Sequence, residues 1–207
     1  MVETVYHLVE LVSMSATKDR ILAAAVQSFG TRGYDGTSLD AVAAEVGLAK
    51  QSVLYYFPSK SKLFLAAVER GIDEFADIFH RALHSTGSGW DRIESLVKDI
   101  FLVATRQPAL LGLVREASRP DSPAVTELGV RFSPVVDQAR GFLKAEIDAG
   151  NFRPADPNLL LLSLYSTVFG VATEIEVLRT IGVEPTLRAA VVRRAELLRF
   201  LRAAVLP

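Results

Sequence analysis

The stretch TSLDAVAAEVGLAKQSVLYYF, residues 37–57, decides the fold that this sequence predicts. Apolar residues recur at helical spacing before and after Gly47, and a glycine in that place ends a helix in a left-handed turn. Two short helices joined by a tight glycine turn are typical of a helix-turn-helix. Because helical geometry is disfavoured just before Pro58, the second helix is expected to end at Tyr56.

The second of these helices, residues 50–56, has two different faces. At about 100° per residue, three apolar side chains cluster on one side: Val53, Leu54 and Phe57. Four polar or aromatic side chains cluster on the other: Gln51, Ser52, Tyr55 and Tyr56. The first group is expected to anchor the helix on its neighbours, and the second to enter a major groove of DNA.

The outer face has chemistry that suits DNA. A tyrosine ring packs on a thymine methyl or a sugar while its hydroxyl bonds a phosphate, and glutamine reads adenine through two hydrogen bonds. Lys50 and Lys60 bracket this face, and together with the amide groups near Thr37 and Ser38 they suit phosphates. Alternatively, the three consecutive aromatics only cover the joint with the next helix, which is the preferred interpretation for Phe57.

Helical patterns also dominate the rest of the chain, and no convincing strand is found, so the predicted fold class is all-α. A capping box of Thr37 and Asp40 is expected to begin one helix, Ser59 is expected to cap another, and Pro134 is expected to kink or split a third. The expected helices are 17–32, 37–46, 50–56, 60–84, 91–106, 109–117, 125–149, 158–180 and 185–205.

Composition narrows the classes of function. The 207 residues are 50% hydrophobic, enough for at least one good core, and the net charge of −1 means that nucleic-acid contact must come from a local patch. The absence of cysteine excludes disulfides, thiolate metal sites and thiol nucleophiles, and it fits a cytoplasmic protein. Residues 1–14 are expected to be an N-terminal extension without an export signal, and no apolar run reaches the length of a membrane span.

From Ile21 to Val68, ILAAAVQSFGTRGYDGTSLDAVAAEVGLAKQSVLYYFPSKSKLFLAAV resembles the N-terminal DNA-binding region of the TetR (tetracycline repressor) family of bacterial transcriptional regulators. The resemblance covers nearly a quarter of the chain and depends most on LYYFPSK, directly after the helix-turn-helix and ahead of a long helix. It implies a homodimer, an all-α fold and a variable C-terminal domain that binds a small effector. No cofactor is expected.

Some positions depart from the common pattern of that family. Ala49 stands where the family usually has a serine that caps the recognition helix, and losing such a cap typically costs around 1 kcal/mol. Gln51, Leu54 and Ser61 replace a frequent glycine, tyrosine and glutamate. The fold prediction is unaffected, but no operator sequence can be transferred from the family.

The expected architecture is a three-helix helix-turn-helix head at 15–60, joined by a long fourth helix to an effector-binding and dimerisation bundle at 61–207. By resemblance, the last two long helices, 158–180 and 185–205, pair with their copies in a homodimer. Residues 159–172 are apolar around most of the circumference, as expected of a helix between its own core and a partner. A simply buried helix is the alternative.

The effector pocket is expected among the five helices from 60–84 to 158–180, and the apolar bias there suggests a hydrophobic or aromatic ligand. The long helix at 60–84 is the expected lever between effector and DNA. Candidate lining residues are Phe75, Phe79, Phe101, Arg115, Glu116, Phe132, Tyr165 and Phe169, with Arg106 and Glu174 as further polar candidates.

One polar stripe has spacing that could ligate a metal. Asp73, Asp77, His80 and His84 are four, three and four residues apart on one helix. The alternative is a solvated face in which the helix dipole favours the two histidines near its C-terminus. No metal site is predicted.

The leading functional hypothesis is a homodimeric repressor, released from a palindromic DNA operator by a small effector. One alternative is a small-molecule-binding helical protein that has lost specific DNA binding, which the missing cap at Ala49 makes conceivable. An all-α enzyme is a poor third hypothesis, because the sequence lacks a Glu-x-x-His pair, a nucleophile elbow and a phosphate-binding loop. We therefore expect no enzyme activity.

Overall fold

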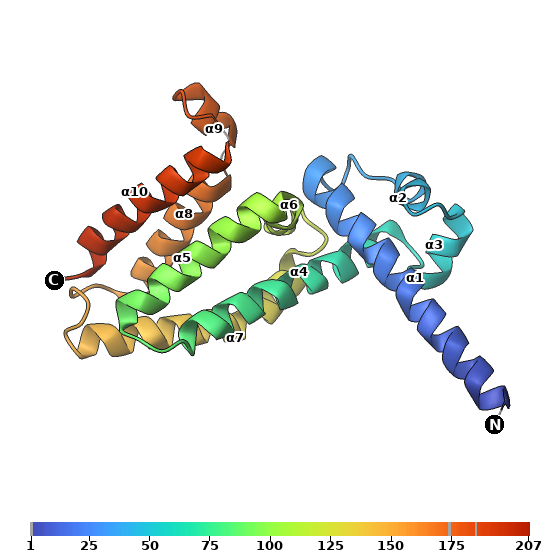
Figure 1. The fold of residues 1–207 in the computed structure, drawn as a ribbon, viewed down its shortest axis with the longest axis horizontal. Coiled ribbons are helices and arrows are strands. Elements are labelled where there is room, and N and C mark those ends of the chain that lie inside the picture. The colour runs from blue at the N-terminus through green and yellow to red at the C-terminus, as the bar shows by residue number, and fades with distance from the viewer. Residues whose placement is uncertain (1, 174, 185) are drawn as a thin grey trace. The chain divides into compact units, whose positions relative to one another are not determined.

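The computed structural model describes the backbone of residues 2–173, 175–184 and 186–207, and the side chains of all of these except 2–13, 175 and 176. Every regular element in this part of the chain is a helix, so the predicted all-α fold is confirmed (Figure 1). The helices are α1 (Val2–Arg32), α2 (Leu39–Glu45), α3 (Lys50–Tyr56), α4 (Lys60–Leu83), α5 (Gly89–Arg106), α6 (Pro108–Ala117), α7 (Val125–Asp148), α8 (Pro157–Thr173), α9 (Ile175–Thr180) and α10 (Leu187–Val205).

The helix-turn-helix forms α2 and α3. Gly47 has a φ of +68°, the left-handed conformation expected between the two helices. The expected cap at Thr37 is wrong by one residue, because the Ser38 side chain accepts the N-cap hydrogen bond from the Ala41 N–H at 3.1 Å. The Thr37 hydroxyl instead donates to the Gly33 carbonyl at 2.9 Å.

Several helix boundaries differ from those expected. α1 begins at Val2, far ahead of the expected start at residue 17. Pro134 lies inside α7, which continues through it as one helix rather than splitting. The helix expected at 158–180 is described as α8 and α9 on either side of Glu174, which lies outside the described residues.

The chain divides into two compact units, Met1–Ile72 with Gly112–Leu128, and Asp73–Leu111 with Gly129–Pro207. The boundaries between the two units fall inside α4, α6 and α7, so each of these helices belongs partly to one unit and partly to the other. Each unit is described by itself below, and the division into functional domains after residue 60 stays a prediction.

The first unit packs α1, α2, α3 and the start of α4 around an aromatic core. The Phe64 ring lies edge-on to Phe29 and Tyr34, with ring centroids 4.9 Å and 5.0 Å apart. α6 closes this unit at very short range, because a Cβ atom on Gly112 would lie 2.0 Å from the Gly30 carbonyl oxygen. Only glycine permits this approach of α6 to the C-terminal end of α1.

The second unit is built around α5, α8 and α10, which contact one another. Its core residues come from these helices, from α7 and from the loop after α7: Trp90, Ile93, Val97, Ile100, Phe101, Leu143, Phe152, Val168, Ala172, Leu197, Leu201 and Val205. Among the described residues, no helix has the combination of length and apolarity that crossing a membrane requires.

Candidate functional site

The second helix of the helix-turn-helix, α3, has the two faces that its sequence predicts. Val53 and Phe57 are 0% and 4% exposed and Leu54 is half-buried, so this side anchors the helix. Tyr55 is 71% exposed and Gln51 is exposed as well. A tyrosine ring held this far out of the protein is accessible for contact with another molecule.

The remaining outer residues, Ser52 and Tyr56, are half-buried at the edges of this face. The rings of Tyr55 and Tyr56 meet edge to face with centroids 5.2 Å apart. Ala49 occupies the N-cap of α3 and makes no side-chain cap bond, as its sequence implies. The start of α3 therefore lacks a side-chain cap.

Both candidate phosphate-binding lysines have partners within the first unit. Lys50 Nζ lies 2.8 Å from Asp40 Oδ2 in an exposed ion pair between α3 and α2. Lys60 Nζ lies 4.4 Å from the centre of the Tyr34 ring and 3.5 Å from the Asp35 carbonyl oxygen. An exposed ion pair contributes only about 0–1 kcal/mol, so Lys50 can exchange Asp40 for a phosphate at low cost.

The two residues expected at the start of α2 have different environments. Ser38 is exposed, whereas Thr37 is 2% exposed with its hydroxyl bound to Gly33 and its N–H bound to the Tyr34 carbonyl. Thr37 therefore shapes the loop and has no free side-chain group for a phosphate.

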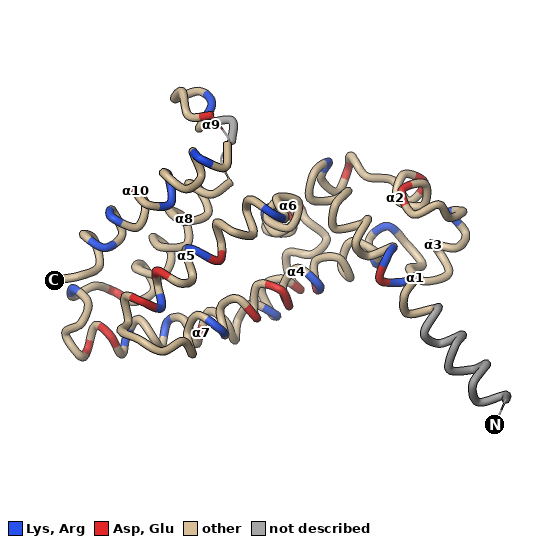
Figure 2. The backbone as a smooth tube through the Cα atoms, in the orientation of Figure 1, with Lys and Arg blue, Asp and Glu red and all other residues tan. Residues whose placement is uncertain are grey.

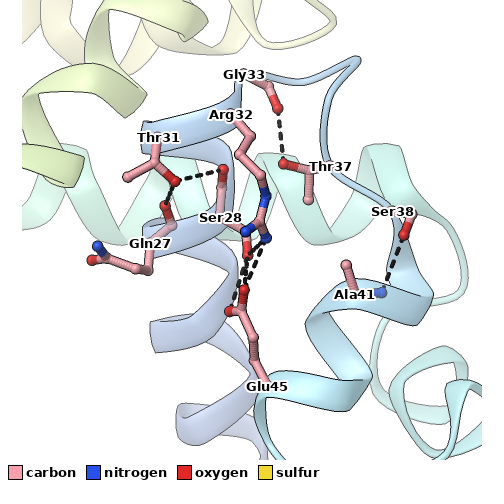
Figure 3. A network of polar contacts seen from close by, with 9 residues as sticks. All are labelled: Gln27, Ser28, Thr31, Arg32, Gly33, Thr37, Ser38, Ala41 and Glu45. Carbon is pink, nitrogen blue, oxygen red and sulfur yellow. Dashed lines mark hydrogen bonds and ion pairs between the residues drawn. The ribbon is translucent and has the colours of Figure 1, made fainter.

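A polar network fixes α2 on α1, and the sequence reasoning missed it (Figure 3). Ser28, only 1% exposed, donates to both carboxylate oxygens of Glu45 at 3.1 and 3.0 Å. The Arg32 guanidinium donates to Glu45 Oε1 at 2.8 Å from the same side. The available signal was a serine on the buried stripe of α1, seven residues after Ile21, since a buried hydroxyl needs a partner.

The second unit contains a cavity of about 70 Å³ between α4, α5, α7 and α8. Three of the expected pocket residues line it: Phe79, Tyr165 and Phe169. The other lining side chains are apolar except Arg92 of α5, which had not been expected. Sequence reasoning could not find Arg92, because an arginine in the first turn of an amphipathic helix ordinarily faces solvent.

Five of the eight expected pocket residues do not line this cavity: Phe75, Phe101, Arg115, Glu116 and Phe132. Phe75 and Phe101 are buried as core residues, and Phe132 is half-buried on α7. Glu116 belongs to the first unit, where its carboxylate accepts a hydrogen bond from the Tyr34 N–H at 2.9 Å. Arg106, the further polar candidate, is exposed.

The polar stripe of α4 is a solvated face. Asp73, Asp77, His80 and His84 are all exposed. The imidazole rings of His80 and His84 stack with centroids 4.1 Å apart, and His84 Nδ1 lies 2.8 Å from the His80 carbonyl oxygen. Within the described part of the chain, no group of three or more His, Asp or Glu side chains could hold a metal ion.

Exposed apolar side chains concentrate on the last three helices and the segment that joins the last two. They include Leu159, Leu162 and Tyr165 on α8, Val177 and Ile181 at α9, and Leu187, Val191, Val192 and Phe200 on α10. We call these nine residues the apolar face. Its neighbour Arg193 has Nε and Nη1 buried without a hydrogen-bond partner among the described residues, and burial lowers the pKa of its guanidinium. Figure 2 shows that basic residues recur along α10.

Comparison with known proteins finds a family match for the segment that contains the helix-turn-helix. Residues 21–67 match the family model described as "Bacterial regulatory proteins, tetR family". The HTH-type transcriptional regulator RutR of Escherichia coli (strain K12) is 25% identical over 156 residues, which cover 75% of this chain and 73% of RutR. IcaR of Staphylococcus epidermidis, a negative transcriptional regulator of the biofilm operon icaADBC, is 31% identical over 105 residues, 51% of this chain and 56% of IcaR.

A solved structure supports the fold over three quarters of the chain. The structure of AibR in complex with isovaleryl coenzyme A and operator DNA superposes with a TM-score of 0.67 at 21% identity, covering 75% of this chain and 85% of AibR. An identity this low supports the common helical fold alone. The segment matched by the family model, residues 21–67, contains α2, α3 and the polar network that joins α2 to α1.

Proposed function

Because this chain belongs to the TetR family of bacterial transcriptional regulators, we propose that it is a homodimeric repressor that leaves a palindromic operator when a small effector binds. The observation that carries the proposal is the outer face of α3, where Tyr55 is 71% exposed on a helix whose inner side is anchored by the buried Val53 and Phe57. A rigid helix that presents polar and aromatic groups is the form in which proteins read a major groove.

The roles at the interface follow from exposure and partners. Gln51 and Tyr55 would contact base edges, and Ser52 and Tyr56 would contact the edges of the groove. Lys50 and Lys60 would bind phosphates on either side, together with the exposed Ser38. Thr37 would support this surface from behind, since its hydroxyl is committed to Gly33.

The apolar face supports the proposal of a homodimer through α8 and α10. A simply buried helix would hide its apolar residues, yet Leu159 and Leu162 are 64% and 58% exposed while Val168 and Ala172 of the same helix are buried. A second copy related by twofold symmetry would cover this face and offer acceptors to Arg193. Two heads joined in this way would bind half-sites about 34 Å apart or more.

The cavity of the second unit is the proposed effector site. AibR, which shares the fold, was solved with isovaleryl coenzyme A and operator DNA, and IcaR is a negative transcriptional regulator. These descriptions support a DNA-binding regulator that also binds a small molecule. As a DNA-binding regulator without catalytic function, the protein would act in the bacterial cytoplasm, where the chromosome lies.

The test is fluorescence anisotropy with the palindromic DNA upstream of the protein's own coding sequence, measured at several salt concentrations. We expect specific binding with a steep salt dependence, since phosphate contacts release counterions. Gln51→Ala and Tyr55→Ala should each lower specific affinity by about ten-fold or more without lowering thermal stability. Gln107→Ala, which removes an exposed glutamine at the end of α5, is the matched control and should bind as the unmodified protein does.

Equal and weak binding to the palindrome and to a scrambled duplex would contradict the proposal. That result, combined with retained ligand binding, would favour the alternative of a small-molecule-binding protein that has lost specific DNA recognition.

A further inference from the structure

We propose that the effector is an apolar carboxylic acid whose anionic head group binds Arg92 in the cavity between α4, α5, α7 and α8. This inference rests on the proposed function, because it names the class of ligand for the same cavity. The evidence is the missing hydrogen-bond partner of Arg92 Nε and the apolar side chains that line the cavity.

Arg92 lines the cavity with a cation that lacks a counterion. Its Nε is buried without a hydrogen-bond partner, and its guanidinium forms no ion pair with any residue that the structure describes. Arg92 as a whole is half-buried, but a buried N–H donor without an acceptor carries a desolvation cost. The position therefore favours a ligand that supplies the missing acceptor.

Three carboxylates of α5 and α7 have hydrogen-bond or ion-pair partners other than Arg92. Asp91 accepts hydrogen bonds from the backbone N–H and the hydroxyl of Ser88. Glu94 pairs with Lys98 within α5, and Glu146 of α7 accepts a hydrogen bond from the Asn151 side chain. None of them neutralises Arg92.

The Phe142 ring holds the arginine at the cavity. The Arg92 guanidinium carbon lies 5.8 Å from the centre of this ring, and Phe142 is itself a lining residue. A cation–π contact of this kind uses none of the guanidinium N–H groups as hydrogen-bond donors, and a guanidinium can form two parallel bonds to a carboxylate. The geometry thus favours a planar anion over a neutral acceptor.

The remaining walls define the rest of the ligand. They consist of aliphatic and aromatic side chains such as Leu96, Val97, Leu164 and Phe169, so the body of the ligand must be apolar. The cavity of about 70 Å³ is smaller than a ligand site of about 300 Å³ or more, so a body of several carbon atoms must push wall side chains aside. Occupancy would then be linked to movement of the surrounding helices, as an effector requires.

Calorimetric titration with a matched pair of probes tests the inference: octanoate, which carries a carboxylate, and octanamide, its neutral counterpart. We expect the unmodified protein to bind octanoate at least about ten-fold more tightly than octanamide. Arg92→Gln should remove this preference while octanamide affinity stays the same. Arg106→Gln, an exposed arginine on the same helix that does not line the cavity, should leave both affinities unchanged.

Arg92→Met fills a similar volume without a charge and guards against a variant that misfolds. It should retain the thermal midpoint of the unmodified protein and should lack the preference for octanoate. Equal octanoate affinity in Arg92→Gln and the unmodified protein, or no saturable octanoate binding at all, would overturn the inference. Operator binding measured without ligand is the separate readout: if it is intact, the regulator function stands even when the carboxylate assignment fails.

Discussion

Glu116 accepts a hydrogen bond from the backbone N–H of Tyr34 at 2.9 Å, joining α6 to the loop after α1 across 82 residues of sequence. Glu116 lies in the last turn of α6, where the helix dipole disfavours a negative charge. Arg119 offsets this cost in part, because its Nη1 lies 3.6 Å from Glu116 Oε2. The carboxylate is therefore held at an unfavourable end of a helix by a bond to the loop that leads into the helix-turn-helix.

Replacing Glu116 by alanine should destabilise the first unit. A hydrogen bond to a charged acceptor contributes about 1.5–3 kcal/mol, and the Glu116 side chain is only 16% exposed, so we expect a loss within that range. Urea unfolding measures it. Glu94→Ala, which removes the partner of Lys98 in a more exposed ion pair, is the control and should cost less than about 0.5 kcal/mol. Equal losses in the two variants would mean that the bond to Tyr34 contributes nothing of its own.

Gly112→Ala should also disturb the packing of α6 on α1. The added Cβ would lie 2.0 Å from the Gly30 carbonyl oxygen, a backbone atom that cannot turn away, so the two helices must separate. We expect a loss of about 1–3 kcal/mol by thermal unfolding, despite the better helix propensity of alanine.

Gly141→Ala is the matched control for this effect. Gly141 also lies inside a helix, α7, but a Cβ there meets no atom within 4 Å. We expect this variant to be more stable by about 0.5–1 kcal/mol, because alanine loses less backbone entropy on folding. Stabilisation by both substitutions would show that the α1–α6 contact is loose in solution.

The helical period of the sequence predicted the two sides of α3 well. Val53 and Phe57 are buried and Tyr55 is exposed because one short helix on a small core has a single buried stripe, and the wheel alone defines that stripe. The same logic predicted a helix-ending turn at Gly47, where the backbone needs a positive φ.

Features that depend on tertiary packing could not be predicted in this way. Thr37 and Ser38 are both good caps, and only the bond from Thr37 to Gly33 decides that Ser38 is the one used. Glu116 looked like a polar handle for a ligand, but whether it faces a cavity or the Tyr34 backbone depends on how α6 packs. Arg92 was missed because the sequence does not show that α7 packs against it. The contact with Phe142 of α7 appears only in the folded structure.

Phe200→Glu should dissociate the proposed dimer. Phe200 is 61% exposed on α10, so the monomer should fold normally, whereas a twofold interface would bury the new charge twice. We expect the dimer dissociation constant to rise by at least about 100-fold, which corresponds to about 2.7 kcal/mol. Analytical ultracentrifugation measures it. Leu102→Glu, at an exposed leucine of α5 outside the apolar face, should leave the dimer intact, and a monomeric unmodified protein would refute the interface.

The pH dependence of stability should reveal the capping box at the start of α5. The backbone N–H of Ser88 and then its hydroxyl donate to the Asp91 carboxylate at 2.8 Å each, and these bonds hold the pKa of Asp91 below its ordinary value of 3.8. A carboxyl whose pKa is lower in the folded state stabilises the fold while it is ionised. Its contribution is complete above the ordinary pKa and is lost as pH falls through the lower folded pKa.

Asp91→Asn should therefore be less stable than the unmodified protein at neutral pH, and the difference should shrink as the solution is acidified through the folded pKa of Asp91. Urea unfolding over a series of pH values measures the difference. Ser88→Ala removes the hydroxyl but leaves the backbone N–H at position 88. In that background, the pH-dependent part of the stability loss caused by Asp91→Asn should be smaller, because one of the two donors to the carboxylate is gone. A difference that grows on acidification would have the opposite sign and would mean that Asp91 is stabilised in its protonated form.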